Sequence, residues 1–426
     1  MNRKMERILL IATTTGYQIR SFGQAAERLG VDLILATDRC HVLDDPWRDG
    51  AISIRFTDEI ASLEAISQAL ETRSIMGIVA VGDRPALLAA LVAKAMTLPG
   101  NSPDAVRIAG NKLLTRSRLR DAKLPSPWFV AVPTDTPVAD LPGQVEFPCV
   151  VKPLKMSASR GVVRVNSLKE LSAAMRRVGH IQNSVEVQAL RDPANSTILI
   201  EEYLPGREVA VEGVLTNGIF RKFGVFDKPD LLEGPFFEET IYVTPSRNSE
   251  QTQQRIRQAV SDASDAVGLT DGPVHAECRI GADDIFVLEI APRPIGGLCS
   301  RALRFSAADG EIVSLEYLLL RHAMGQPISD YRREEKAAGV MMIPIPADGL
   351  YKGVDGLDVA QAVPYVEDVV ITARRDQRIR PLPEGDSYLG FIFARASQPT
   401  QIESALRSAH RCLEFRIEAS IPVVSS

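Results

Sequence analysis

Hydrophobic and polar residues alternate most clearly between residues 274 and 297, where the pattern predicts two strands joined by a turn. One face of each strand is wholly apolar and suits a core, comprising Val274, Ala276, Cys278 and Ile280 in the first strand and Phe286, Leu288 and Ile290 in the second. The opposite face carries His275, Glu277 and Arg279, and then Glu289. Residues 281–284 have the composition of a hairpin turn. With a connecting loop of three or five residues, Glu277 would lie directly across from Glu289, with Cβ atoms about 5 Å apart.

Two carboxylates this close repel each other unless a cation lies between them. Mg²⁺ takes oxygen ligands and often shares them with substrate phosphates. Taken alone, such a pair is more often simply two solvated strand residues. Arg293 and Gly296-Gly297 follow shortly afterwards, and a guanidinium beside glycines that allow close approach is typical of a phosphate site.

The first 100 residues repeat a strand–helix–strand pattern. Strands are predicted at residues 7–12, 31–36 and 78–81, with a helix that ends at Gly30 and another over residues 85–96. This order favours a small parallel α/β domain. No GxGxxG follows the first strand, so the dinucleotide-binding fingerprint is absent.

The middle of the chain carries lysines near small-residue and acidic segments. Lys112 lies in a basic helical stretch, and Lys152 lies in a predicted strand that leads into the small-residue loop Lys155 to Gly161. Such a loop can fold its backbone N–H groups over phosphates, although on its own this composition is more typical of a plain surface turn. Another strand over residues 197–202 ends in two acids before a Pro-Gly turn. Beyond residue 330, strands at 339–346 and 388–394 and an amphipathic helix at 402–412 predict a separate C-terminal α+β unit.

Length and composition bound the class of protein. A chain of 426 residues exceeds one ordinary core, so two to four domains are expected. Net charge of -5 argues against a nucleic-acid partner, and no apolar stretch approaches the roughly 20 residues that span a membrane. The five cysteines, Cys40 among them, form no CxxC, which argues against a disulfide or zinc framework and fits a cytoplasmic location.

The ordered set of motifs is distinctive: Lys112, VVKP with Lys152, the Ser/Gly loop, ILIEEYLPGRE, HAECR and LEIAPRPIGG. It resembles the ATP-grasp superfamily over about residues 100–325. Within that superfamily the chain looks most like carboxylate–amine ligases of the L-amino acid (dipeptide) ligase type, because of its FDKPD…GPFFEE…TPSR insertion and long C-terminal unit. The resemblance implies an N-terminal α/β domain over residues 1–100, an ATP-grasp domain of two subdomains that clasp ATP over 101–328, and an α+β unit over 329–426.

The resemblance also implies a role for each candidate site residue. Lys112 and Lys152 would contact the ATP phosphates, and the loop from Ser157 through Ser159 to Gly161 would close over them. Glu201 would bind the adenine amino group, with backbone atoms of Glu202, Tyr203 and Leu204 nearby. Glu208 would bind the ribose. Glu277 and Glu289 would bind Mg²⁺, with Mn²⁺ as an alternative ion, and Arg293 would hold the phosphate in transfer.

Two positions depart from the pattern of the superfamily. Many members have Asn where this chain has Ala291, so the choice between one and two Mg²⁺ ions is open. Members often have Asp where this chain has Asn111.

The expected reaction converts a carboxylate to an acyl phosphate with ATP, after which an amine attacks to form an amide. Charged residues of both signs in loops 227–247 and 293–310 suit zwitterionic amino acids; they are Lys228, Glu233, Glu238, Glu239, Arg247, Arg301 and Arg304. Two alternatives stay open: a biotin-carboxylase-like or purine-pathway enzyme that activates bicarbonate or formate, and a nucleotide-binding regulator without turnover. The identity of the two substrates and the oligomeric state, with a homodimer among the options, also stay open.

Overall fold

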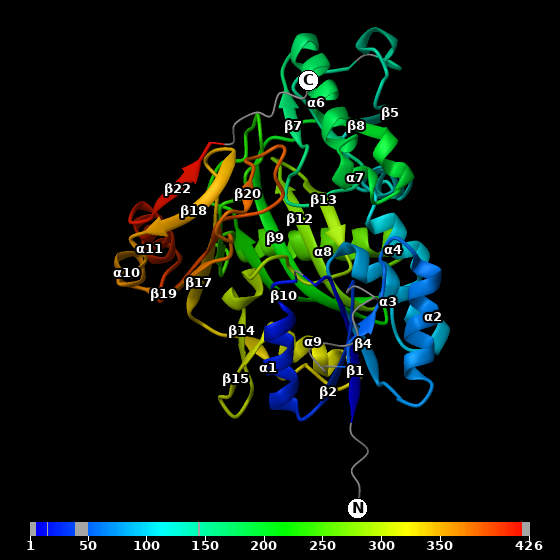
Figure 1. Ribbon diagram of the computed structural model, residues 1–426, viewed down its shortest axis with the longest axis vertical. Helices are drawn as coiled ribbons and strands as arrows, with labels where there is room; N and C mark the ends of the chain where they lie inside the picture. Colours follow the sequence, from blue (N-terminus) through cyan, green and yellow to red (C-terminus); the bar gives the residue numbers. More distant parts are fainter. Residues whose placement is uncertain (1–5, 15, 39–49, 144, 420–426) are drawn as a thin grey trace, which may run out of the picture.

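The computed structural model describes residues 6–14, 16–38, 50–143 and 145–419, so Cys40 lies outside the described residues. Figure 1 shows a central sheet with the N-terminal domain below it, a smaller subdomain above it and the C-terminal strands to the left. No helix among the described residues combines the length and the apolar character needed to cross a membrane.

The N-terminal domain contains the predicted parallel sheet, with strand order β3-β2-β1-β4. Its elements are β1 (Arg7–Ala12), α1 (Ile19–Leu29), β2 (Asp32–Thr37), β3 (Ile52–Ser53), α2 (Glu59–Leu70), β4 (Gly77–Val81) and α3 (Asp83–Met96). Strand β1 is apolar from Ile8 onward because both of its faces are covered. Ile8 and Leu10 pack with Phe22 of α1, whereas Leu9 and Ile11 pack with residues of α2 and α3.

A second, four-stranded sheet forms the upper subdomain, with strand order β5-β8-β6-β7. It follows two helices, α4 (Pro103–Ala109) and α5 (Lys112–Asp121). The remaining elements of the subdomain are β5 (Phe129–Pro133), β6 (Cys149–Pro153), β7 (Val163–Val165), α6 (Leu168–Gln182), α7 (Val185–Gln188) and β8 (Thr197–Glu202). Helix α6 packs Leu171, Met175 and Val178 against this sheet.

The central sheet has eight strands in the order β13-β12-β9-β10-β11-β17-β21-β19. Its first part consists of β9 (Arg207–Thr216), β10 (Ile219–Asp227), β11 (Ile241–Thr244), β12 (Gly272–Ile280) and β13 (Ile285–Ala291), with α8 (Glu250–Val267) packed on one face. Its second part consists of β17 (Ala337–Ile343), β19 (Val366–Ile371) and β21 (Gly390–Ala396), with α11 (Pro399–Arg411) packed on it. The elements outside this sheet are β14 (Arg304–Ser306), β15 (Ile312–Ser314), α9 (Leu315–Ala323), β16 (Arg332–Arg333), β18 (Gly349–Asp355), α10 (Leu357–Gln361), β20 (Arg378–Ile379) and β22 (Glu414–Glu418).

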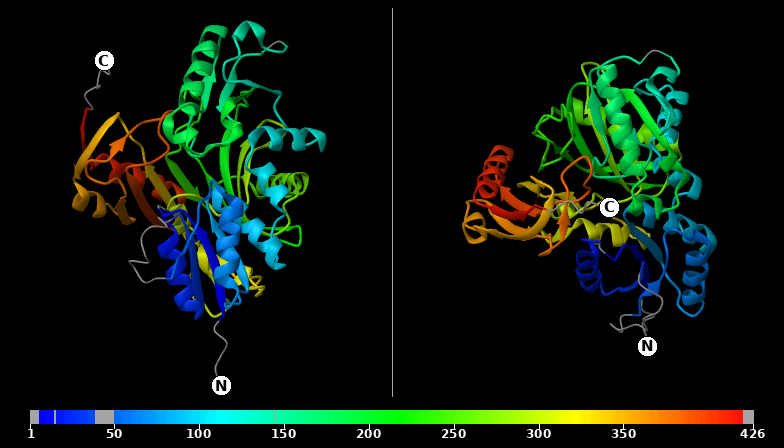
Figure 2. Two further views of the ribbon diagram at one scale, coloured as in Figure 1. Left: turned by 45° about the vertical axis from the view of Figure 1, so that its right-hand side comes forward. Right: turned by 45° about the horizontal axis from the view of Figure 1, so that its top comes forward.

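The predicted C-terminal α+β unit shares the central sheet with the residues that precede it. Strand β17 pairs with β11 from Ile241↔Met341 to Thr244↔Ala338, so one sheet continues across the expected boundary at residues 328/329. Only β18, β20 and β22 of the C-terminal stretch form a sheet of their own among the described residues. Figure 2 shows these strands extending to one side of the central sheet.

The β12–β13 hairpin has the predicted pair of glutamates for a different reason than expected. Its connection contains four residues, 281–284, yet Glu277 pairs with Glu289, because a bulge at Leu288 shifts the register between Glu277 and Cys278. Before the bulge the phase of β13 is the reverse of the prediction, so Phe286 and Leu288 do not face the core, whereas Ile290 does as predicted. The core-facing residues are Ile285, Val287 and Ile290, whereas Leu288 lies in the cavity described below.

The packing of α11 on β17 gives a test of this arrangement. A Cβ atom at Gly339 would lie 2.5 Å from Ile402 Cγ2 and 2.8 Å from the backbone carbonyl oxygen of Tyr242. We predict that Gly339→Ala lowers the free energy of unfolding by about 1–3 kcal/mol through overpacking. Gly23→Ala in α1 is the control, since nothing lies within 4 Å of its added Cβ, and it should stabilise the protein by up to about 1 kcal/mol. Urea unfolding measures both, and a Gly339→Ala protein as stable as wild type would contradict the packing of α11.

Candidate active site

A cavity of about 420 Å³ lies where the three parts of the chain meet. It is lined by Lys112, Lys152, Ser157, Ser159, Glu201, Glu202, Tyr203, Leu204, Glu208, Glu277, Glu289 and Arg293. These are the residues expected from the sequence, apart from Gly161, whose N–H donates to the Pro383 carbonyl at 2.9 Å. The cavity thus brings residues from distant parts of the chain into one site.

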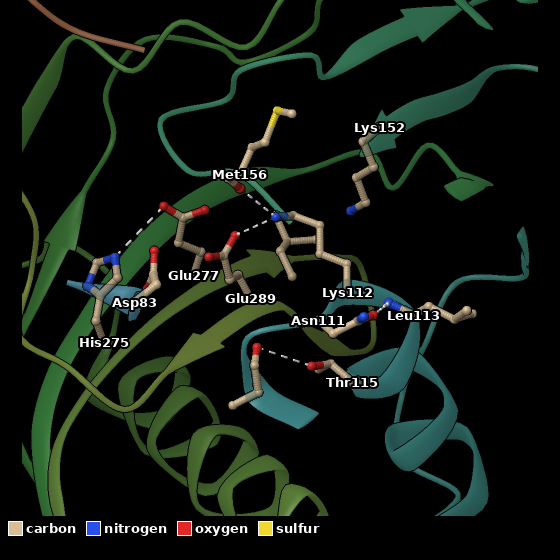
Figure 3. Close-up of polar contacts among 12 residues, drawn as sticks. Asp83, Asn111, Lys112, Leu113, Thr115, Lys152, Met156, His275, Glu277 and Glu289 are labelled. Atoms are coloured by element: carbon tan, nitrogen blue, oxygen red, sulfur yellow. Dashed lines mark hydrogen bonds and ion pairs between the residues drawn. The ribbon is translucent and has the colours of Figure 1, made fainter. Parts of the chain in front are cut away.

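The opposed glutamates face the cavity between cations (Figure 3). The Lys112 ammonium lies 3.6 Å from Glu289 and donates to the Met156 carbonyl at 2.8 Å. His275 Nε2 lies 3.9 Å from the Glu277 carboxylate. Both glutamate side chains keep some exposure, 21% for Glu277 and 28% for Glu289, so their oxygens can reach a ligand.

A buried charge network supports Lys152. Its ammonium donates to Glu201, and Arg116 donates to the same carboxylate from Nε at 2.9 Å. Burial lowers the pKa of Lys152 to about 8 despite the attraction of Glu201. Burial opposes the ionisation of Glu201 as well, but Arg116 and Lys152 outweigh it and hold its pKa at about 2. Glu201 therefore fixes the position of Lys152, and its predicted contact with adenine stays a prediction.

Arg116 also explains how the bulge in β13 is tolerated. Its guanidinium donates to the carbonyls of Val287 at 3.0 Å and Leu288 at 2.9 Å. A bulge leaves part of the strand ladder unpaired, and buried carbonyls need donors. Arg116, itself fully buried, supplies them.

Lys228 occupies a cage of three carboxylates at the other side of the cavity. Its ammonium donates to Glu208 at 2.6 Å, to Glu277 at 3.2 Å and to Glu239. Burial alone would lower the pKa of Lys228, but the three carboxylates raise it well above its usual value. Burial and the charge of Glu277 raise the pKa of Glu239 to about 7. Glu208 also accepts from Arg279 at 2.6 Å, so its predicted contact with ribose stays a prediction.

The segment with Arg293 is held by the N-terminal domain. Arg293 Nε donates to Asp83, the first residue of α3, at 2.6 Å. Burial opposes the ionisation of Asp83, but the Arg293 guanidinium outweighs it and lowers the pKa of Asp83. Gln18 donates to the carbonyls of Ile295 and, at 3.2 Å, Gly297. The site is therefore incomplete without the N-terminal domain.

Buried His275 and Glu212 lie directly beneath this segment. The His275 Nδ1–H donates to Glu212, which also accepts from the Ile295 N–H at 3.2 Å. Burial opposes protonation of His275, but the Glu212 carboxylate outweighs it and raises the pKa of His275 to about 9. The Glu212 carboxylate thus links the 293–297 segment to His275 on the strand that carries Glu277.

Beyond Arg293 the cavity has an apolar and aromatic wall, to which the C-terminal stretch contributes. Tyr17 packs edge-on against Phe391 with ring centroids 5.7 Å apart, and Tyr388 packs on the same ring at 6.3 Å. Met342 and Tyr242 also line this end. We call it the acceptor chamber.

Some of the charged residues that the sequence suggested for substrate contact lie elsewhere. Arg301 pairs with Asp368 and Arg304 pairs with Glu367, so both arginines hold β19 instead of facing the cavity. Arg247 pairs with Glu403 of α11. Of the suggested residues, Glu239 lines the cavity. Lys228 lies behind it in the carboxylate cage and donates to Glu239.

Other site residues were not found from the sequence. Arg116 follows Lys112 by four residues on one helix, a spacing that places both on the same face and could have revealed it. Asp83 follows the carboxyl end of a parallel strand, where ligand sites of α/β domains gather. The pairing of Glu212 with His275 depends on the β9–β12 register and has no local signal.

Comparison with known proteins agrees with this architecture. Residues 145–302 match the ATP-grasp domain, residues 23–100 match the ATP-grasp N-terminal domain, and residues 341–418 match the L-amino acid ligase C-terminal domain 2. The chain belongs to the ATP-grasp enzymes, among the ADP-forming ligases that join a carboxylate to an amine.

Two solved structures and one ligase sequence are similar to this chain over different shares of its length. The crystal structure of L-amino acid ligase from Bacillus licheniformis has a TM-score of 0.81 and 26% identity, covering 98% of this chain and 100% of that one. Carboxyaminoimidazole ribonucleotide synthase from Aspergillus clavatus, solved with ATP, has a TM-score of 0.69 and 18% identity over 96% of this chain and 98% of that one, which shows the fold alone. Alanine–anticapsin ligase of Bacillus amyloliquefaciens is 23% identical over 55% of this chain and 52% of that ligase, so this chain spans about half of its length.

The buried network gives a prediction of stability. Arg116→Met removes the donors to Glu201 and to the two bulge carbonyls, so we expect the free energy of unfolding to fall by about 3–5 kcal/mol. Arg118→Met is the matched control, because Arg118 lies exposed on the same helix, and its effect should stay within about 0.5 kcal/mol. Urea unfolding compares the two variants. Equal free energies of unfolding for the two variants would show that the contacts of Arg116 do not stabilise the fold in this way.

Proposed function

We propose that the protein joins two amino acids, or an amino acid and a related amine, through an acyl phosphate formed from ATP. The observation that carries the proposal is the meeting of Lys112, Lys152, Glu277, Glu289 and Arg293 at one cavity that continues into the acceptor chamber. Phosphoryl transfer needs positioning and charge neutralisation above all, and these groups supply both.

The nucleotide would lie between the upper subdomain and the central sheet. Residues 202–204 line the cavity together with Val150 and Leu288, whose apolar side chains suit an adenine ring. Lys112 and Lys152 would contact the phosphates as compact charges. The loop of residues 155–161, which has positive φ angles at Met156, Ala158 and Ser159, would cover them.

Glu277 and Glu289 fit a magnesium site by the chemistry of their donors. Each offers carboxylate oxygens to the cavity, and the Glu208–Glu239–Glu277 cage is already held by Lys228. The pair Glu277 and Glu289 is therefore the one that would bind the ion. When bound, Mg²⁺ neutralises and orients the phosphates of ATP.

In the proposed reaction a carboxylate oxygen of the first substrate attacks the γ-phosphorus, and ADP leaves. Arg293 would hold the transferred phosphoryl group, with Asp83 fixing its guanidinium. The amine nitrogen of the second substrate then attacks the acyl carbon, loses a proton, and phosphate departs. No side-chain nucleophile is needed.

Amino acids are favoured as substrates by the composition of the acceptor chamber. Bicarbonate or formate would leave the wall formed by Tyr17, Tyr388 and Phe391 without a partner. An organic side chain would bury it, and burial of apolar surface is favourable by roughly 25 cal/mol per Å². The likeness to the L-amino acid ligase of Bacillus licheniformis supports the same substrate class.

The metal role predicts the effect of one charge. Glu289→Gln removes the negative charge that would bind Mg²⁺ but keeps the shape of the side chain. We therefore expect ADP release to fall about 100- to 1,000-fold in a folded protein. Mn²⁺ binding in the presence of a non-hydrolysable ATP analogue, followed by electron paramagnetic resonance, should weaken in parallel. Asp284→Asn, in the exposed turn of the same hairpin, is the control and should change neither quantity. A Glu289→Gln protein with normal ADP release and Mn²⁺ binding would remove Glu289 from the metal site.

The substrate class is tested by a screen of amino acid pairs for ADP release, with products identified by mass spectrometry. We expect ADP formation that depends on added amino acids and yields a dipeptide or related amide. ADP release driven by bicarbonate or formate alone would favour the alternative in which the protein activates one of these small anions. ATP binding without turnover under all these conditions would favour a regulator.

A further inference from the structure

Residues 380–388, which connect β20 to β21, form a loop that leaves the C-terminal strands and reaches the upper subdomain (Figure 2). We call them the C-terminal loop. The Gly161 N–H donates to the Pro383 carbonyl at 2.9 Å, so this loop contacts the 155–161 loop directly. The two loops are more than 200 residues apart in the sequence.

Ion pairs reinforce this contact on both sides. Arg177 of α6 makes a two-bond contact with Glu384, at 2.6 Å from Nε and 3.0 Å from the second nitrogen. Arg160, within the 155–161 loop, donates to Asp386 at 3.2 Å. The C-terminal loop is therefore tied both to the 155–161 loop and to the helix behind it.

The other end of the C-terminal loop lines the cavity. Asp386, Ser387 and Tyr388 all belong to the cavity wall, and Tyr388 packs on Phe391 in the acceptor chamber. One short segment thus contacts the predicted cover of the nucleotide and the chamber proposed for the substrate.

The C-terminal loop has a defined shape, but its ion pairs are exposed. The Gly385 N–H donates to the Pro381 carbonyl at 2.9 Å, and a Cβ at Gly385 would lie 1.9 Å from the Arg380 oxygen. The side chains of Glu384 and Asp386 are 38% and 58% exposed. Exposed ion pairs are individually weak and screened by salt. Such contacts can open and close during turnover, as covers of active sites do.

We infer that the C-terminal loop positions the 155–161 loop over the phosphates of bound ATP. Arg160, Arg177, Glu384 and Asp386 are then positioning residues for the ligase reaction. The inference rests on the proposed function, because it takes the 155–161 loop to cover ATP. It gives the C-terminal stretch a part in nucleotide binding as well as in the acceptor chamber.

A charge exchange tests the inference in the full-length protein. Binding of a non-hydrolysable ATP analogue with Mg²⁺ is measured by calorimetry for wild type, Glu384→Arg, Arg177→Glu and the double variant Arg177→Glu/Glu384→Arg. Each single variant should weaken binding about threefold to tenfold, because it places like charges together. The double variant should restore most of the affinity. Glu384→Gln, a milder change, should weaken binding less than Glu384→Arg and serves if a charge reversal prevents folding.

Asp355→Arg is the matched control. It breaks the exposed Arg416–Asp355 pair, which joins β22 to β18 within the C-terminal stretch. Its affinity for the analogue should equal that of wild type. Unchanged affinity in Glu384→Arg and Glu384→Gln, or a double variant no better than the singles, would overturn the inference while leaving the proposed function in place. A wild-type protein that does not bind the analogue would overturn both.

Discussion

The structure depends on one constraint: every charge buried around the cavity needs a partner of opposite sign. The carboxylates proposed to bind a metal and the lysines proposed to bind phosphate lie close together in a partly dry site, where unpaired charges are costly. The protein meets the constraint with two cationic anchors. Arg116 neutralises Glu201 and so leaves Lys152 at the cavity wall. Lys228 neutralises the carboxylates beside Glu277, and Lys228 and His275 together outweigh burial and hold the pKa of Glu277 well below its usual value.

The central sheet is the platform on which these charges are arranged. Its strands bring the metal-binding candidates of β12 and β13 and the C-terminal strands of the acceptor chamber into one continuous layer. The N-terminal domain then completes the site from outside the sheet, where Asp83 holds Arg293 and Gln18 holds the segment that follows it. The upper subdomain faces this layer across the cavity and carries Lys152 and the 155–161 loop. A site assembled from separate parts can admit ATP and substrate and then exclude water by small movements of loops.

The sequence predicted the parts of the site better than their connections. Strand periodicity and turn composition placed Glu277 and Glu289 in one hairpin, because those signals are local, and the resemblance to a known family added Lys152 to the same site. The bulge at Leu288 could not be predicted, since it depends on Arg116 from a distant helix supplying donors to the carbonyls it exposes. The continuation of the sheet from β11 to β17 was missed for a similar reason. Pairing between distant strands is decided by packing in the folded protein, which a strand pattern does not record.

The central claim is that the carboxylate substrate is activated by direct transfer of the γ-phosphoryl group. It is tested most directly with ¹⁸O at both carboxyl oxygens of the amino acid that supplies the carbonyl group of the amide, in a reaction with unlabelled ATP, the second amino acid and Mg²⁺. Attack of the carboxylate on phosphorus, followed by attack of the amine on carbon, moves one labelled oxygen from the substrate to inorganic phosphate. Mass spectrometry of the phosphate should therefore detect one ¹⁸O atom for each amide formed. Amide formation with unlabelled phosphate would contradict an acyl phosphate and, with it, the roles proposed for Lys152, Arg293 and the two glutamates.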